Sequence, residues 1–160
     1  MEVSTRTYKT PISVLVVVHT PELEVLLLER ADRPGFWQSV TGSQDAGETL
    51  VQTALRELAE ETGIDGALYE LTDWGIQNRY EIYPQWRYRY APGITHNIEH
   101  VFSVQVPRAS PMVLNPREHL AYVWLPWQAA AGRAFSWSNV EAIRRLPQRI
   151  SGSNTRTKQN

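Results

Sequence analysis

The sequence of 160 residues contains no cysteine, which excludes disulfide bonds and thiolate metal sites. It also lacks a long apolar run: the longest strongly apolar stretch covers 12–18, far short of the roughly 20 residues that span a bilayer. The N-terminus does not combine a basic region, an apolar stretch and a small-residue cleavage site, the features of a signal peptide. We therefore expect a cytoplasmic protein without a membrane partner.

Net charge is almost absent as well. The 16 Lys and Arg residues nearly balance the 17 Asp and Glu residues, for a formal net charge of -1, so there is no global attraction to nucleic acid. The 42% hydrophobic and 21% charged residues are ordinary for a globular chain of one-domain length. We expect a single domain over 1–150 and a disordered tail at 151–160, because the polar tail has nothing to bury. The oligomeric state is left open.

The pattern of apolar residues predicts several strands and helices. Nearly continuous apolar character over 12–19 is typical of a strand buried on both faces, and 25–29 is expected to pair with it as a hairpin. Further strands are expected at 97–106 and 121–125, with strand-like sequence over 68–83 interrupted near Gly75, part strand and part loop at 84–93, and helices at 127–132 and 138–146. Ser138 is the expected N-cap of the last helix.

The most informative stretch is 42–64, GSQDAGETLVQTALRELAEETGI. It predicts a helix from Gly47 or Glu48 to Thr62, with Gly63 as the left-handed residue just past its end. One mostly apolar arc of the helix, about 100° wide, contains Val51, Ala54, Leu55, Leu58 and Thr62. That arc is expected to face the core.

The adjacent arc of this helix carries Glu57, Glu60 and Glu61. Carboxylates at positions i, i+3 and i+4 lie on one face and repel one another, so stability alone does not favour the arrangement. A hard divalent cation such as Mg²⁺ prefers carboxylate oxygens and turns the repulsion into a binding site. The alternative is a solvated helix face, which leaves the spacing of the surrounding glycines and arginine unexplained.

The same stretch resembles the signature of the Nudix hydrolases. The matching positions are Gly42, Glu48, Arg56, Glu57, Leu58, Glu60, Glu61, Gly63 and Ile64. The flanking segments FWQSVTGS, RYAPGITHN, EHLAYVWL and SWSN look like those of the dihydroneopterin triphosphate diphosphatases of bacterial folate synthesis. The resemblance implies the family fold, an α/β/α sandwich around a mixed β-sheet.

The resemblance also implies an activity. It is hydrolysis of dihydroneopterin triphosphate to the monophosphate and diphosphate with Mg²⁺, or alternatively Mn²⁺, so the expected partner is a small-molecule triphosphate and not a nucleic acid. Two alternatives stay open. One is a Nudix diphosphatase for ordinary or oxidised (deoxy)nucleoside triphosphates, and the other is a non-catalytic domain that binds a ligand or RNA.

By resemblance, the expected metal ligands are Glu57, Glu60, Glu61 and Glu118. Glu60 and Glu118 are also candidates for the catalytic base, and Glu57 is expected to be catalytic as a direct metal ligand. Arg56 is expected to pair with a neighbouring glutamate, with Glu48 as a candidate, and to hold a carboxylate in orientation.

The residues expected to bind substrate lie mostly outside the signature. By resemblance, the candidates are Lys9, Arg30, Thr41 and Ser136, together with Tyr80, Glu81, Ile82 and Tyr83 around the pterin ring. A flat ring favours an aromatic stack and a carboxylate facing its N–H edge, and Glu81 with Tyr80 or Tyr83 could supply both. The alternative for this segment is an aromatic cluster on an edge strand. The arginines 79, 87 and 89 are further candidates for phosphate contacts.

Overall fold

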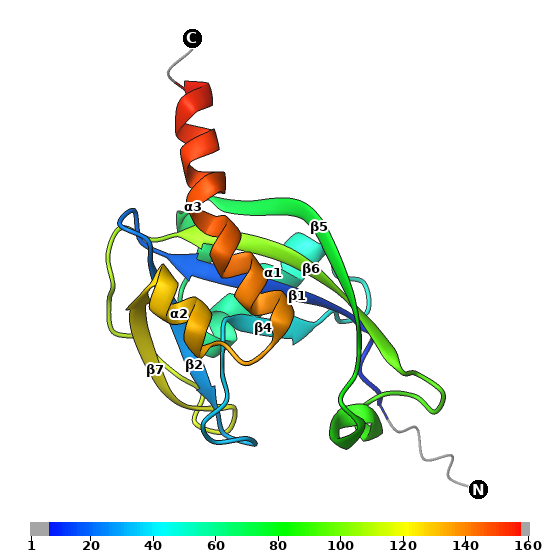
Figure 1. Cartoon of the computed structure of the whole chain (residues 1–160). Helices are drawn as coiled ribbons and strands as arrows, with labels where there is room; N and C mark the ends of the chain where they lie inside the picture. The colour runs from blue at the N-terminus through cyan, green and yellow to red at the C-terminus, as the bar shows by residue number, and fades with distance from the viewer. Residues whose placement is uncertain (1–6, 158–160) are drawn as a thin grey trace, which may run out of the picture.

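The computed structural model describes residues 7–157 (Figure 1). A mixed β-sheet forms the middle layer, with α1 on one face and α2 and α3 on the other. This arrangement is the α/β/α sandwich that the sequence predicts. None of the helices within residues 7–157 is both long and apolar enough to cross a lipid bilayer.

The elements follow one another in a mixed order of strands and helices. The strands are β1 Ile12–His19, β2 Glu24–Arg30, β3 Trp37–Gln38, β4 Val40–Ser43, β5 Leu71–Glu81, β6 His96–Gln105 and β7 His119–Pro126. The helices are α1 Leu50–Thr62, α2 Trp127–Arg133 and α3 Trp137–Thr157, with 3₁₀ turns η1 Gly66–Leu68 and η2 Pro84–Arg89.

Strand β1 lies at the centre of the 7-stranded sheet, and the sheet divides beside it. β1 pairs in parallel with β6 along its whole length, from Ile12↔Ile98 to His19↔Gln105. The hairpin expected between β1 and β2 pairs only at its turn, His19↔Val25. Beyond that point β1 pairs with β4, whereas β2 pairs with β3 and β7. The two branches therefore separate, and the space between them is available for a site.

Each face of the sheet has its own hydrophobic core. On one face Ala54 and Leu58 of α1 pack with Val14, Val16 and Phe102. On the other face α2 and α3 pack against alternate residues of the same strands, Leu15, Val17, Leu27 and Val101 among them. Residues of both parities along β1 are buried, which is why its sequence is apolar without interruption.

Helix α1 begins later than the sequence predicts. Thr49 is its N-cap and forms a capping box with Gln52, so the helix starts at Leu50 and not at 47 or 48. Gly63 ends it in the left-handed conformation, with φ 77°, as predicted. Glu48 is left outside the helix, where its side chain can reach Arg56.

Two other local predictions are wrong. The segment 84–93 has no strand: Pro84 begins the turn η2, where its fixed φ and missing N–H are tolerated. Ser136, not Ser138, is at the start of α3, since its Oγ accepts a hydrogen bond from the N–H of Asn139. Helix α3 ends at Thr157, and the expected disorder of 151–160 stays a prediction. Residues 158–160 of that expected tail lie outside the described residues.

Candidate active site

A cavity of about 1000 Å³ lies where the two branches of the sheet separate. Strands β1 to β7, helix α1 and the start of α3 all contribute to its walls. The signature residues and the main substrate-binding candidates line it: Lys9, Arg30, Thr41, Arg56, Glu57, Glu60, Glu61, Tyr80, Glu81, Ile82, Tyr83, Glu118 and Ser136. Of the additional arginines, Arg89 lines the cavity, while Arg79 and Arg87 are not among the described lining residues.

Gly42 makes room for the carboxylate of Glu57. A Cβ at Gly42 would meet Cδ and both carboxylate oxygens of Glu57 at distances no real side chain tolerates. Because β4 and α1 pack so closely here, Glu57 is 9% exposed, and burial raises the pKa of its carboxyl to about 7, against the opposing effect of Arg56. Even with the Arg56 guanidinium beside it, this carboxyl keeps its proton to a higher pH than an ordinary glutamate does.

Arg56 holds the glutamates in place. Its Nε and Nη2 donate to the two oxygens of Glu48 at 2.7 and 3.0 Å. Nη1 donates to Glu57 at 2.8 Å and to Glu60 at 3.3 Å, and Nη2 also donates to the carbonyl oxygen of Ser43 at 2.9 Å. The hydrogen bonds from Arg56 lower the pKa of Glu48 to about 2. The expected pairing of Arg56 with Glu48 is therefore present, and it links α1 to the loop before it.

Glu61 is the most deeply buried of the signature carboxylates. Its side chain is 4% exposed, Oε2 accepts the N–H of Thr41 at 3.1 Å, and Oε1 lies 3.7 Å from Nε2 of His119. Burial raises the pKa of Glu61 well above its ordinary value, and the charges of Glu57 and Glu118 raise it further. Burial also lowers the pKa of His119 to about 4, so the imidazole is neutral near pH 7.

Glu61, Glu118 and His119 could together hold a metal ion, because one ligand atom from each lies within 4.8 Å of the others. A buried carboxylate, an exposed carboxylate and a neutral imidazole suit a divalent cation. Glu57 is close enough to raise the pKa of Glu61 through its charge. Glu60 differs from these groups, since its side chain is 51% exposed and is paired with Arg56. Its expected roles as ligand and base stay predictions.

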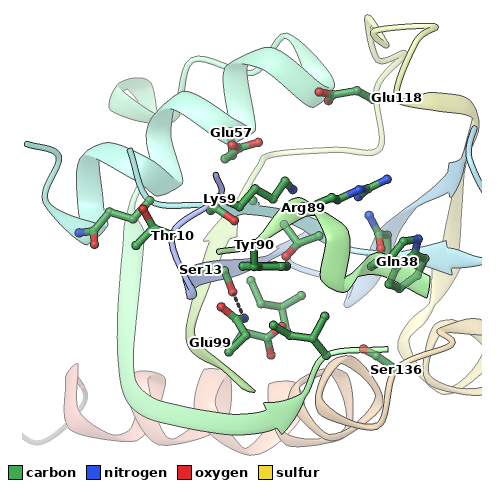
Figure 2. A pocket seen from close by; sticks show the side chains of 18 of the residues that line it. Lys9, Thr10, Ser13, Gln38, Glu57, Arg89, Tyr90, Glu99, Glu118 and Ser136 are labelled. Atoms are coloured by element: carbon green, nitrogen blue, oxygen red, sulfur yellow. Dashed lines mark hydrogen bonds between the residues drawn. The ribbon is translucent and has the colours of Figure 1, made fainter. Parts of the chain in front are cut away.

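A cationic region lies beside the carboxylates. Arg30 donates through Nε and Nη2 to Asp32, both at 2.7 Å, and its guanidinium lies 4.5 Å from the ring centroid of Trp86. Arg89 donates to the same aspartate at 2.9 Å. Burial and the charge of Arg89 lower the pKa of Lys9. In Figure 2, Lys9 and Arg89 lie between Glu118 at the top of the cavity and Glu99 and Ser136 at the bottom. An anion such as a phosphate would relieve this concentration of positive charge.

The segment expected to surround the pterin ring is at the end of β5. Ile82 is 3% exposed, and the hydroxyl of Tyr80 accepts a hydrogen bond from Asn97 at 3.0 Å. Tyr83 packs edge-on against Trp86, with the ring centroids 5.3 Å apart. The carboxylate of Glu81 is exposed and paired with Arg87. Apolar and aromatic surfaces for a flat ring are thus present, at a distance from the signature glutamates.

Comparison with known proteins identifies the family. A model of the NUDIX domain matches residues 9–146. The chain belongs to the Nudix family. A dihydroneopterin triphosphate diphosphatase of Escherichia coli is 46% identical over 141 residues, which cover 86% of this chain and 93% of that protein. The Haemophilus influenzae protein of the same name is 43% identical over 141 residues, covering 86% and 88%.

A solved structure agrees with these relatives. The E. coli dihydroneopterin triphosphate pyrophosphohydrolase superposes with a TM-score of 0.82 at 45% identity, covering 88% of this chain and 97% of that one. The predicted resemblance and the predicted Nudix fold are therefore confirmed, and the relatives agree with the predicted class of enzyme, a Nudix diphosphatase.

Several residues of this Nudix cavity were not predicted from the sequence. His119 follows Glu118 directly, but no spacing among the histidines indicates a ligand. Asn97 and Glu99 of β6 are almost completely buried and line the cavity. The alternation that predicts Val101 to face inward also puts these two residues on the same face, so a buried carboxylate on β6 could have been found by extending the pattern toward the start of the strand.

Proposed function

We propose that this Nudix domain is a divalent-metal-dependent diphosphatase of folate biosynthesis that hydrolyses dihydroneopterin triphosphate to dihydroneopterin monophosphate and diphosphate. The supporting observation is that one cavity combines a carboxylate-rich end, a cationic region and an aromatic end. A substrate with a triphosphate and a flat bicyclic ring matches that combination. The two relatives with 46% and 43% identity are named for this reaction.

Glu57, Glu61 and Glu118, with His119 beside them, are the residues that would hold the metal, and Mg²⁺ is the ion that carboxylate oxygens favour. A bound divalent cation neutralises phosphate charge and lowers the pKa of water. Arg56 contributes by fixing the direction of Glu57 through the hydrogen bond of 2.8 Å. Gly42 contributes by leaving the space in which that carboxylate lies.

Lys9, Arg30 and Arg89 would neutralise the phosphate charge that the bound cation does not. Arg30 is already held in position by Asp32 and Trp86, so little rotamer entropy is lost when substrate binds. Glu118 is exposed at the cavity and belongs to no ion pair described for residues 7–157. It is therefore the better placed of the candidate bases, because Glu60 is engaged by Arg56.

A panel of triphosphates tests the proposal. Dihydroneopterin triphosphate, dGTP, 8-oxo-dGTP and dATP would be supplied at matched concentrations with Mg²⁺, and released diphosphate measured separately from orthophosphate. We expect kcat/KM for the pterin to exceed that of every nucleotide by about tenfold or more. A preference for a nucleotide would overturn the substrate, and absence of turnover with any of them would favour a binding domain.

A further inference from the structure

Two buried acceptor atoms on β6 face the cavity without a partner. Asn97 is 1% exposed and Glu99 is 4% exposed, and both line the cavity. Among the described residues, neither Oδ1 of Asn97 nor Oε1 of Glu99 has a hydrogen-bond partner. A buried acceptor without a partner is costly, so such atoms in a cavity wall indicate a ligand that donates hydrogen bonds.

The amide of Asn97 lies with its oxygen as the free acceptor. Its Nδ2 donates to Oγ of Ser13 at 2.7 Å and to the hydroxyl of Tyr80 at 3.0 Å. In this orientation both N–H groups are used, and Oδ1 is left to accept from a ligand.

Glu99 is held on the same face of the strand. Its backbone is in register with Ser13 of β1 and Asn78 of β5, so the strand is fixed from both sides. Burial raises the pKa of the Glu99 carboxyl, and hydrogen bonding from Ser138 and Asn78 opposes that rise. Residues i and i+2 of a strand point to one face about 7 Å apart, so Asn97 and Glu99 present their acceptors to one bound molecule.

The position of Glu99 fits the ring and not the phosphates. In Figure 2, Glu57 and Glu118 lie toward one end of the cavity and Glu99 toward the other, with Lys9 and Tyr90 between them. A triphosphate held at the carboxylate-rich end would carry its ring toward Glu99.

We propose that Glu99, with Asn97 as a further acceptor, recognises the donor edge of a 2-amino-4-oxopyrimidine ring, formed by its ring N–H and exocyclic amino group. Both pterin and guanine carry this donor edge, so the edge alone does not distinguish them. The inference therefore rests on the proposed function for the rest of the substrate. A ring without these donors leaves the buried acceptors unpaired and is therefore disfavoured.

Glu81 is the other carboxylate at this end of the cavity, and the two can be told apart. Glu81 is exposed to water, and its Oε1 is paired with Arg87. Glu99 is 4% exposed, and its Oε1 has no hydrogen-bond partner among the described residues. Selection by Glu81 would therefore be weak, while selection by a buried acceptor is strong.

The test compares GTP with ITP, which differ only in the exocyclic amino group. We expect the wild-type protein to show kcat/KM roughly 10- to 100-fold higher for GTP, as expected for a hydrogen bond to a charged group. In Glu99→Gln the GTP/ITP ratio should fall to within about threefold, with KM for GTP changing more than kcat. The same variant should raise KM for dihydroneopterin triphosphate.

Two variants serve as references. Glu81→Gln tests the rival carboxylate, and Glu141→Gln on the exposed side of α3, where Glu141 pairs with Arg145, controls for loss of a surface charge. Because burial disfavours the ionised carboxyl, Glu99→Gln should fold with an unchanged or higher Tm, whereas a purely structural role predicts a lower Tm.

The outcomes separate the two proposals. A GTP/ITP ratio near one in the wild type, an unchanged ratio in Glu99→Gln, or collapse of the ratio in Glu81→Gln would each overturn the role of Glu99. A nucleotide preferred over dihydroneopterin triphosphate would overturn the proposed substrate while leaving the GTP/ITP comparison valid.

Discussion

A Cβ on Gly42 would occupy the space that the carboxylate of Glu57 fills. The close approach of β4 to α1 at this point determines the direction of the Glu57 carboxylate, a proposed metal ligand. We expect Gly42→Ala to displace Glu57 and to reduce kcat about 100-fold or more, because metal ligands must be held within about 0.5 Å of the productive geometry. Initial rates over a range of Mg²⁺ concentrations measure the effect.

Gly132→Ala in α2 is the matched control. A Cβ at Gly132 meets no heavy atom within 4 Å in the described part of the chain. Alanine in a helix stabilises by about 0.5–1 kcal/mol relative to glycine, so this variant should keep full activity and gain stability. Equal activity of the two alanine variants would contradict the role given to Gly42.

Glu61→Gln is expected to abolish metal-dependent turnover and to leave the fold intact. The glutamine oxygen can still accept the N–H of Thr41, now 3.1 Å from Oε2 of Glu61. The charge that binds the cation is lost, and so is the cost of burying it. Activity should fall at least about 100-fold, while thermal denaturation in EDTA shows an equal or higher Tm. Unchanged activity would refute the assignment of Glu61 as a ligand.

Arg56→Lys should lower activity although the charge is kept. An ammonium group cannot reproduce the paired bonds of 2.7 and 3.0 Å to Glu48 together with the bonds to Glu57 and Ser43. We expect kcat to fall about 10- to 100-fold, with a smaller change in KM and a lower Tm. Arg144→Lys on α3 is a control for the exchange itself, since Arg144 is exposed. Wild-type kcat in Arg56→Lys would show that a point charge is enough to hold the glutamates in position.

Local sequence predicted the parts of the fold that short-range physics determines. The apolar run 12–19 and the stop glycine Gly63 are where the pattern puts them. The start of α1 was predicted too early, because Thr49 competes as a better cap and Glu48 is held by Arg56. The 3₁₀ turn η2 was missed, because alternation of aromatic and basic residues describes a strand as well as it describes a turn after Pro84.

The residues of the site that were missed depend on strand pairing. Glu99 reaches the cavity through the parallel register of β6 with β1, which sets it beside Ser13. His119 lies near Glu61 because β7 pairs with β2, with Arg30 in register with His119. Period-two alternation indicates which face of the sheet a side chain lies on, but long-range packing determines which strand pairs with it. The signature motif could thus be recognised from local sequence, whereas the strand pairing that brings Glu99 and His119 into the cavity could not.

The pH dependence of stability tests the burial of Glu57 directly. In the metal-free protein the pKa of this carboxyl is raised from 4.5 to about 7, so between these values the folded state keeps a proton that the unfolded state has released. Stability from this group is present below pH 4.5 and is lost as pH rises through about 7.

His119 acts in the opposite direction, since its pKa falls from 6.5 to about 4, so the comparison must be made against Glu57→Gln. In urea denaturation with EDTA, the free energy of unfolding of the wild type relative to Glu57→Gln should fall by roughly 2–3 kcal/mol between pH 5 and pH 8. A difference that is constant over this range would show that Glu57 is not desolvated, and added Mg²⁺ should reduce the loss at pH 8, where the carboxylate is ionised.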